Sequence, residues 1–191
     1  NGINGFKYKK NITINAKNSG TLGRLILGLL IKSPQKIKLI GDKSLSKRDF
    51  YRVIKPLQNF GAKFYPNQKK KLPLSIIGPK ITKPTNYIEN KGSAQCKSSV
   101  MLAALNTPGT TSIKAKKSRN HTELLFQYLK VPIKIKKTKK FDYIKIKGGK
   151  KIQAFDYKIP ADISSSAFFI VLTVLSNNSK LLIKNVNINP S

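Results

Sequence analysis

The stretch NSGTLGRLILGLLI at residues 18–31 leads through a polar loop, SPQ at 33–35, into the strand-like run KIKLI at 36–40. A turn of small residues opens an apolar helix, and the loop returns the chain to a strand. The same layout recurs at 92–115 and at 161–186, about 70 residues further along each time. A period of this length accommodates a complete α/β unit rather than a solenoid repeat.

The first two copies continue in the same way. Each has a turn with Ser and Arg, then a helix with apolar residues three and four positions apart, then strands in which lysine alternates with apolar residues. The turns are predicted at 44–48 and 117–120, and the helices at 50–60 and 121–129. The alternating strands are predicted at 133–136 and 143–147. Each copy therefore reads strand, helix, strand, helix, strand, strand, which predicts one sheet with helices on one side.

The predicted fold class is α/β, built from repeated βαβαββ subdomains. We place two such units at about 7–81 and 82–150, within a first domain that covers 1–159. The turns at 147–150 and 159–161 are the expected exits from that domain. Residues 160–191 then begin a second domain that is cut short, with a last strand at 180–186.

The charge is strongly positive, with 38 basic against 7 acidic residues and a net of +31. Nucleic-acid binding is one interpretation. The other is a codon bias toward Lys, Asn and Ile, which we favour because the lysines are spread along the whole chain and few of the cations are arginine. Where lysine is the default cation, an arginine indicates a site that needs guanidinium geometry. The four arginines are Arg24, Arg48, Arg52 and Arg119.

Several further bounds follow from composition. No run of about 18 apolar residues is present, so no membrane span is expected. The longest apolar stretches, at about 25–31 and 167–175, have the length of buried helices. The single cysteine, Cys96, excludes an internal disulfide, suggests a reducing cytoplasm and is expected to be buried in a helix. No cluster of metal ligands is found, and His121 in a first helical turn is more typical of a structural residue.

The chain begins at Asn1 rather than Met and stops straight after a strand-like run, so we expect an internal piece of a longer protein.

The turns at 18–21 and 92–95 are candidate anion sites, because a helix that begins in small residues presents free amides and the positive end of its dipole. Gly20 would let a ligand approach the main chain closely. The alternative is ordinary helix capping by Ser19 and Ser93. By the same reasoning Asp162 is the expected N-cap of the third helix.

The arginine turns strengthen the anion hypothesis. Arg48 and Arg119 each follow a strand and precede a helix, and loops beyond the carboxyl ends of parallel strands meet at one rim. We therefore expect both side chains to converge on a basin for small polyanions. The alternative is a surface ion pair between Arg48 and Asp42 or Asp49, which would specify nothing.

Five motifs resemble those of the 3-phosphoshikimate 1-carboxyvinyltransferase (5-enolpyruvylshikimate-3-phosphate synthase) family. They are NSGTLGR at 18–24, GDKSLSKR at 41–48, SAQCKS at 93–98, KSRNHTE at 117–123 and PADISSSAF at 160–168, with Asn189 and Pro190 from a sixth. The resemblance implies a two-domain fold with substrates in the cleft between the domains. It also implies transfer of the enolpyruvyl group of phosphoenolpyruvate to the 5-hydroxyl of shikimate 3-phosphate, on the way to chorismate and the aromatic amino acids.

The resemblance also implies binding residues. Shikimate 3-phosphate would contact Ser93, Ala94, Gln95, Ser118 and Arg119, and phosphoenolpyruvate would contact Gly20, Arg48 and Gln95. Gly20 lies where the family's sensitivity to glyphosate is set. Neither a cofactor nor a metal is expected, and the partners are the two small substrates, without nucleic acid or membrane. The full-length protein is expected to be a cytoplasmic monomer.

Some family features are missing from these residues. The early lysine-serine-arginine motif is absent, as are the aspartate and glutamate that move protons in the second domain. No catalytic residue is therefore assigned, and the chain alone is expected to be inactive. Two alternatives stay open. One is the related UDP-N-acetylglucosamine enolpyruvyl transferase, although the loop 43–48 lacks its reactive cysteine. The other is a basic RNA-binding or RNA-end-processing protein.

Overall fold

The computed structural model describes residues 12–66, 71–187 and 189. The chain divides into two compact units, Asn1–Gln153 and Ala154–Ser191. The predicted start of the first subdomain near residue 7 and the motif residue Pro190 lie outside the described residues.

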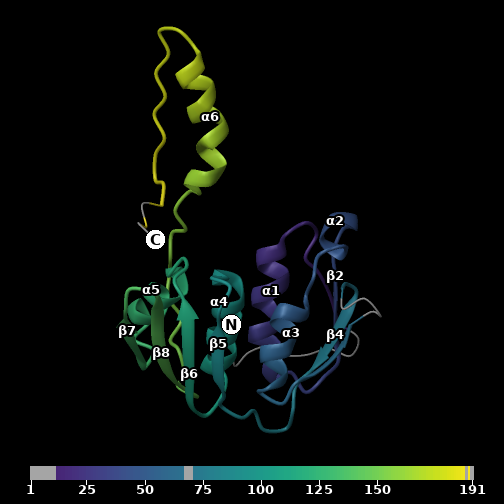
Figure 1. Cartoon of the computed structure of the whole chain (residues 1–191). Helices are drawn as coiled ribbons and strands as arrows, with labels where there is room; N and C mark the ends of the chain where they lie inside the picture. The colour runs from purple at the N-terminus through teal and green to yellow at the C-terminus, as the bar shows by residue number, and fades with distance from the viewer. Residues whose placement is uncertain (1–11, 67–70, 188, 190–191) are drawn as a thin grey trace. The chain divides into compact units, whose positions relative to one another are not determined.

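The first unit begins with a four-stranded sheet in the order β1-β2-β4-β3 (Figure 1). Strands β1 and β2 run parallel, and the other pairs are antiparallel. Its elements are β1 (Thr13–Asn15), α1 (Gly20–Leu29), a 3-10 turn η2 (Leu30–Lys32), β2 (Ile37–Ile40), α2 (Lys43–Ser46), α3 (Tyr51–Gln58), β3 (Lys63–Pro66) and β4 (Leu74–Ile77). Apart from the short α2, this is the predicted βαβαββ order.

A second sheet repeats the first, with the order β5-β6-β8-β7 and the same pattern of one parallel and two antiparallel pairs. Its elements are β5 (Asn86–Glu89), α4 (Ala94–Leu105), β6 (Gly109–Lys116), α5 (His121–Tyr128), β7 (Ile133–Lys137) and β8 (Phe141–Gly148). The predicted α/β class and the repeated subdomain are thereby confirmed. Helix α3 begins at Tyr51, one residue after its predicted start, and α5 begins at His121, as predicted.

Helices α1 and α4 pack against each other and join the two sheets into one core (Figure 1). A Cβ atom at Gly28 on α1 would overlap the carbonyl oxygen of Ser99 on α4. The Ser99 hydroxyl in turn donates a 2.9 Å hydrogen bond to the Arg24 carbonyl oxygen. The apolar run at 25–31 therefore forms a buried helix, as expected, and its glycine allows the two backbones to approach closely.

The parallel pairs direct four loops to corresponding sheet edges. Asn15 of β1 is paired with Ile40 of β2, and Glu89 of β5 with Ala115 of β6. Parallel strands place their carboxyl ends side by side, so the loops that follow them are neighbours. These are the loops that carry the predicted anion-binding turns and the two arginine turns.

The second unit consists mainly of α6 (Ile163–Leu175), capped by the Asp162 carboxylate, which accepts a 2.9 Å hydrogen bond from the Ser164 amide. The predicted strand at 180–186 is wrong, since only an isolated bridge between Ala161 and Val186 is formed there. A strand needs a ladder, and the described part of this unit has no sheet to extend.

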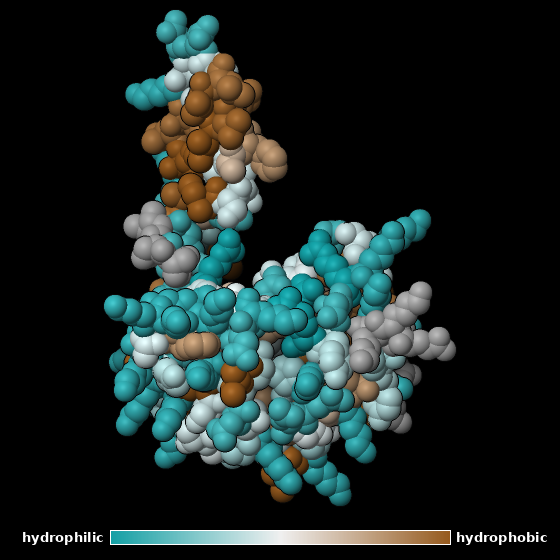
Figure 2. Space-filling view, in the orientation of Figure 1, coloured by the Kyte–Doolittle hydropathy of each residue, from teal (hydrophilic) through white to brown (hydrophobic). Residues whose placement is uncertain are grey.

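The surface of α6 is largely apolar and exposed, in contrast to the hydrophilic visible face of the first unit (Figure 2). Phe168, for example, is 82% exposed. The expectation of a buried helix is wrong here, because no described element of its unit covers it. Among the described helices, none combines the length and the apolar character that a membrane crossing requires.

Candidate functional site

The start of α1 offers free main-chain donors. The Ser19 hydroxyl caps the helix by accepting a 3.1 Å hydrogen bond from the Leu22 amide. The amides of Gly20 and Thr21 have no hydrogen-bond partner among the described residues. Capping and anion binding are therefore compatible here, because the cap uses only one of the orphan amides of the first turn.

Two guanidinium groups lie over this helix start. A Cβ atom at Gly20 would lie 2.7 Å from Arg24 Nη1 and 3.1 Å from Arg48 Nη1. Arg24 is half-buried and donates to the Gly20 and Asp49 carbonyl oxygens, at 3.4 and 3.3 Å. Its guanidinium also stacks on the ring of Phe50 at 5.2 Å from the centroid, a contact that fixes its plane.

The arginines affect one another electrostatically. Burial is the main cause that lowers the pKa of the Arg24 guanidinium below its usual value. The positive charges of Arg48 and Arg52 lower this pKa further, whereas Cys96 and Asp49 act in the opposite sense. Arg24 stays protonated at neutral pH in spite of this shift. Three of the four arginines of the chain thus share one region, which favours a dianion as the ligand that balances them.

Gln95 joins this region to the second subdomain. Its Oε1 accepts a 3.0 Å hydrogen bond from Arg24 Nη1, and its Nε2 donates a 2.9 Å hydrogen bond to Thr21 Oγ1. The first turn of α4 therefore lies directly beside the first turn of α1. Gly20, Arg48 and Gln95, the three residues predicted to hold one ligand, are brought together around Arg24.

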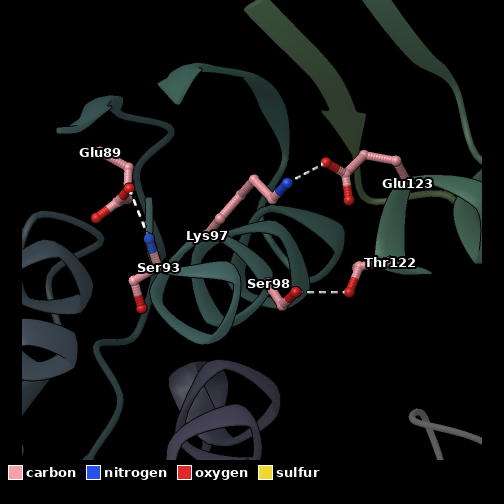
Figure 3. Close-up of polar contacts among 6 residues, drawn as sticks. All are labelled: Glu89, Ser93, Lys97, Ser98, Thr122 and Glu123. Atoms are coloured by element: carbon pink, nitrogen blue, oxygen red, sulfur yellow. Dashed lines mark hydrogen bonds and ion pairs between the residues drawn. The ribbon is translucent and has the colours of Figure 1, made fainter. Parts of the chain in front are cut away.

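The start of α4 resembles that of α1. The Ser93 hydroxyl accepts from the Cys96 amide at 3.3 Å. The buried Glu89 carboxylate accepts from the Ser93 amide (Figure 3) and also from the Lys91 amide. The amides of Ala94 and Gln95 have no partner in the part of the chain that the structure describes. Glu89 thus fixes the turn while two helix-start donors stay available.

The loop after β6 carries the remaining predicted residues. A Cβ atom at Gly92 would lie 3.4 Å from the Lys117 carbonyl oxygen, so this loop adjoins the turn before α4. The Ser118 hydroxyl oxygen is shielded from solvent and has no hydrogen-bond partner among the described residues. Arg119 is exposed. A shielded hydroxyl without a partner is uncommon in proteins and suggests a ligand group as its partner.

The two sequence-based alternatives for Arg48 can now be compared. Within residues 12–66, 71–187 and 189, Lys97 and Glu123 form the one ion pair closer than 4 Å, so Arg48 pairs with neither Asp42 nor Asp49. The Asp42 carboxylate instead accepts hydrogen bonds from the Asn18 side chain and from the Leu45 amide.

Sequence reasoning missed Arg24 as a site residue. A signal was present, because Arg24 closes the motif at 18–24 and is one of only four arginines in a lysine-rich chain. The convergence of Arg48 with Arg119 stays a prediction, whereas Arg48 lies close to Gly20 beside Arg24, and the charges of Arg48 and Arg52 both act on Arg24. Cys96 is buried, as expected, and His121 is exposed in the first turn of α5.

The groups assembled here are guanidinium, amide and hydroxyl donors. Such groups bind and orient small anions and stabilise negative charge, but they are poor proton carriers at neutral pH. In the described residues, no three His, Cys, Asp or Glu side chains come together as a metal site would require.

Comparisons of the sequence and of the fold with known proteins point to one family. The family model for EPSP synthase (3-phosphoshikimate 1-carboxyvinyltransferase) matches residues 1–191. The chain is 40% identical over 181 residues to the 3-phosphoshikimate 1-carboxyvinyltransferase of Petrotoga mobilis, covering 93% of the chain and 41% of that protein. The corresponding Streptococcus pyogenes protein (serotype M49) is 38% identical, with 94% and 42% covered.

Among solved structures, EPSP synthase from Acinetobacter baumannii superposes with a TM-score of 0.81 at 34% identity, over 99% of the chain and 42% of that structure. The chain thus spans about two fifths of the length of the relatives it matches.

Proposed function

The chain belongs to the EPSP synthase (3-phosphoshikimate 1-carboxyvinyltransferase) family, and on that premise we propose that it carries part of the substrate site of an enolpyruvyl transferase. The reaction joins phosphoenolpyruvate to the 5-hydroxyl of shikimate 3-phosphate. The hydroxyl oxygen attacks C2 of phosphoenolpyruvate while C3 gains a proton. Phosphate then leaves from C2 as C3 loses a proton, which restores the double bond.

One observation carries the proposal. Gln95 at the start of α4 is hydrogen-bonded to Arg24 on α1, beside Gly20 and Arg48. Two helix starts with free amides and two guanidinium groups thereby face a common region. A small phosphorylated acid carries two or more negative charges, and guanidinium groups bind phosphate and carboxylate in a bidentate manner. This region is the proposed phosphoenolpyruvate subsite.

The shikimate 3-phosphate subsite is proposed at the start of α4 and in the adjoining loop. Ser93, Ala94 and Gln95 would contribute the helix-start donors there, and Ser118 and Arg119 would close the subsite from the next loop. The free Ala94 and Gln95 amides and the unpartnered Ser118 hydroxyl support this assignment. Because Gln95 borders both subsites, it would hold the two substrates side by side.

The contribution of these residues to catalysis would be positioning and electrostatic stabilisation. Bringing two anionic substrates together is opposed by their mutual repulsion, and fixed positive groups offset that repulsion before the reaction starts. Proton transfer at C3 and at the 5-hydroxyl would come from groups other than those proposed here. We therefore expect the 191-residue chain to bind shikimate 3-phosphate without turning it over.

Isothermal titration calorimetry of the chain with shikimate 3-phosphate tests the proposal, with Arg119→Ala as the binding-site variant. The matched control is Lys134→Ala, which removes an exposed cation from β7. We expect about tenfold weaker binding for the Arg119 variant, the loss of one charged hydrogen bond, and no change for the control. Equal affinities of both variants and the wild type, or release of phosphate by the chain alone, would contradict the proposal.

The finer expectations about partners and location are also proposals. We propose a cytoplasmic protein that is monomeric at full length, whose second domain begins at 160–191. The compact unit that starts at Ala154 supports the last of these. The scattered lysines favour small anions over nucleic acid as partners. Tight, steeply salt-dependent binding of arbitrary RNA without competition by shikimate 3-phosphate would favour the nucleic-acid interpretation instead.

A further inference from the structure

We propose that the buried ion pair between Lys97 and Glu123 is a positioning device that holds the Ser118–Arg119 loop in register with the start of α4. This inference rests on the proposed function, because it concerns how the shikimate 3-phosphate subsite is assembled. It assigns a role to two residues that have no place among the proposed substrate contacts.

The pair bridges two helices just inside the proposed subsite. Lys97 Nζ lies 2.5 Å from Glu123 Oε1, and the two side chains are 0% and 4% exposed (Figure 3). Lys97 lies in the first turn of α4, where its amide donates to the Ser93 carbonyl oxygen. Glu123 lies in the first turn of α5, four residues after Arg119. The contact therefore joins the two chain segments that the subsite needs to keep together.

A second bridge lies next to the first. The hydroxyl groups of Ser98 and Thr122, which neighbour Lys97 and Glu123 in sequence, are 2.7 Å apart and share a hydrogen bond (Figure 3). Two adjacent contacts between the same helix starts restrict their relative orientation more than one contact does.

The composition of the chain makes this burial notable. Only seven of its residues are acidic, and three of these (Glu89, Glu123 and Asp142) are buried in the second subdomain. Among the described residues, Lys97 is the one buried lysine. The other lysines that the structure describes are half-buried or exposed, so the burial of Lys97 at the start of α4 reflects a specific local requirement.

Stability alone does not account for the pair. Desolvation of two charges cancels much of their attraction, so well-packed apolar residues at such positions are often as stable or more stable. The helix dipole also disfavours a cation in the first turn of α4, although it favours the Glu123 carboxylate in the first turn of α5. A directional contact fixes the register of two helices more sharply than apolar packing does, which is what a site built across two helix starts requires.

The other side of α4 is fixed in a similar way. Glu89, at the end of β5, accepts hydrogen bonds from the amides of Lys91 and Ser93. The start of α4 is thus held by a carboxylate from β5 on one side and by a carboxylate from α5 on the other (Figure 3). The Ala94 and Gln95 amides therefore lie between two anchored positions, the turn bound by Glu89 and Lys97 bound by Glu123.

The test is calorimetric titration of shikimate 3-phosphate into the 191-residue chain and three variants. The first replaces the pair by apolar residues, Lys97→Met with Glu123→Leu. The second, Lys97→Arg, keeps the charge and the contact. The third, Thr107→Val, is the control, because it removes a buried hydroxyl that donates to the Ala103 carbonyl oxygen at the opposite end of α4. Thermal unfolding of each variant is measured in parallel.

We expect the apolar pair to unfold at or above the wild-type temperature and yet to bind about tenfold more weakly, since Arg119 is no longer held in place. Lys97→Arg should recover most of the affinity. The control should lower the unfolding temperature without changing affinity. Wild-type affinity in a folded apolar variant overturns the inference, whereas no binding by the wild-type chain overturns the proposed function and the inference together.

If the apolar pair does not fold, Lys97→Met with Glu123→Gln decides the question. This variant removes the ion pair and both charges, and it keeps the length of both side chains. We expect a severalfold loss of affinity, because the contact between the two helix starts is lost. An affinity equal to that of the wild type then overturns the inference.

Discussion

Arg24 Nη1 donates a hydrogen bond of 3.0 Å to Gln95 Oε1, across a separation of 71 residues. Arg24 lies one turn into α1 and Gln95 lies in the first turn of α4, the equivalent helices of the two subdomains. The site is therefore built at the junction of two repeats, and neither repeat contains it alone. A change to either residue should be felt in both proposed subsites.

Gln95→Ala tests this junction. We expect about tenfold weaker binding of shikimate 3-phosphate, because a ligand contact is lost and the Arg24 guanidinium loses the acceptor that orients it. Calorimetric titration of the chain measures the effect. Gln58→Ala, at the exposed end of α3, is the matched control. Equal losses in the two variants would show that Gln95 has no special role.

Gly20→Ala tests the closeness of the guanidinium groups. The new methyl group would lie 2.7 Å from Arg24 Nη1 and 3.1 Å from Arg48 Nη1, so both flexible side chains must move. We expect a fold of similar stability and roughly tenfold weaker binding of phosphoenolpyruvate, measured with shikimate 3-phosphate present.

The control for that substitution is Gly23→Ala in the same helix, whose methyl group would contact the Phe50 ring at 3.3 Å instead of a guanidinium. An unchanged phosphoenolpyruvate affinity in Gly20→Ala, or the same loss in both variants, would remove Gly20 from the subsite.

Much of the fold was readable from the sequence because the period of apolar residues, the small-residue turns and the arginine turns recur together. The strand predicted at 180–186 failed for a physical reason. A strand is stabilised by its neighbours in the sheet, and a local pattern does not reveal whether those neighbours are present. The exposed α6 illustrates the same limit, since its apolar sequence indicates a need for burial but not what provides it.

The candidate site shows a different limit. The sequence motifs identified Gly20, Arg48 and Gln95 as candidate ligand contacts. The contacts between the two repeats, however, depend on how α1 packs against α4. That packing depends on the close approach of the two backbones at Gly28. The sequence around a glycine in an apolar helix does not indicate which helix packs against it. Lys97 and Glu123 were hidden for the same reason, because a lysine among many lysines carries no signal until its burial is seen.

Asp42 provides a pH-dependent test of the loop that carries Arg48. Hydrogen bonds from the Asn18 side chain and from the Leu45 amide lower the pKa of the Asp42 carboxyl below its ordinary value of 3.8. A lowered pKa in the folded state means that this contribution to folding is present above pH 3.8 and is lost as the pH falls through the folded-state value. Carboxyl carbon shifts in an NMR titration report the pKa directly.

In the variant Asn18→Ala, the pKa of Asp42 should rise toward 3.8, because the largest of its stabilising contacts is removed. An Asp42 pKa that is the same in the two proteins would show that Asn18 does not hold the carboxylate.

The energetics of the buried pair can be separated from its proposed positioning role. Lys97→Met leaves the Glu123 carboxylate buried without its cation, and we expect a loss of about 3–5 kcal/mol in the free energy of unfolding. Adding Glu123→Leu should bring the stability back to the wild-type value or above it, since the unpaired charge is removed together with its desolvation cost. Lys134→Met, on the exposed surface of β7, is the matched control and should change stability by less than about 0.5 kcal/mol. Denaturant unfolding followed by circular dichroism measures all three variants. If the double variant were as unstable as Lys97→Met, packing at the contact between α4 and α5, and not charge pairing, would be what these two residues supply.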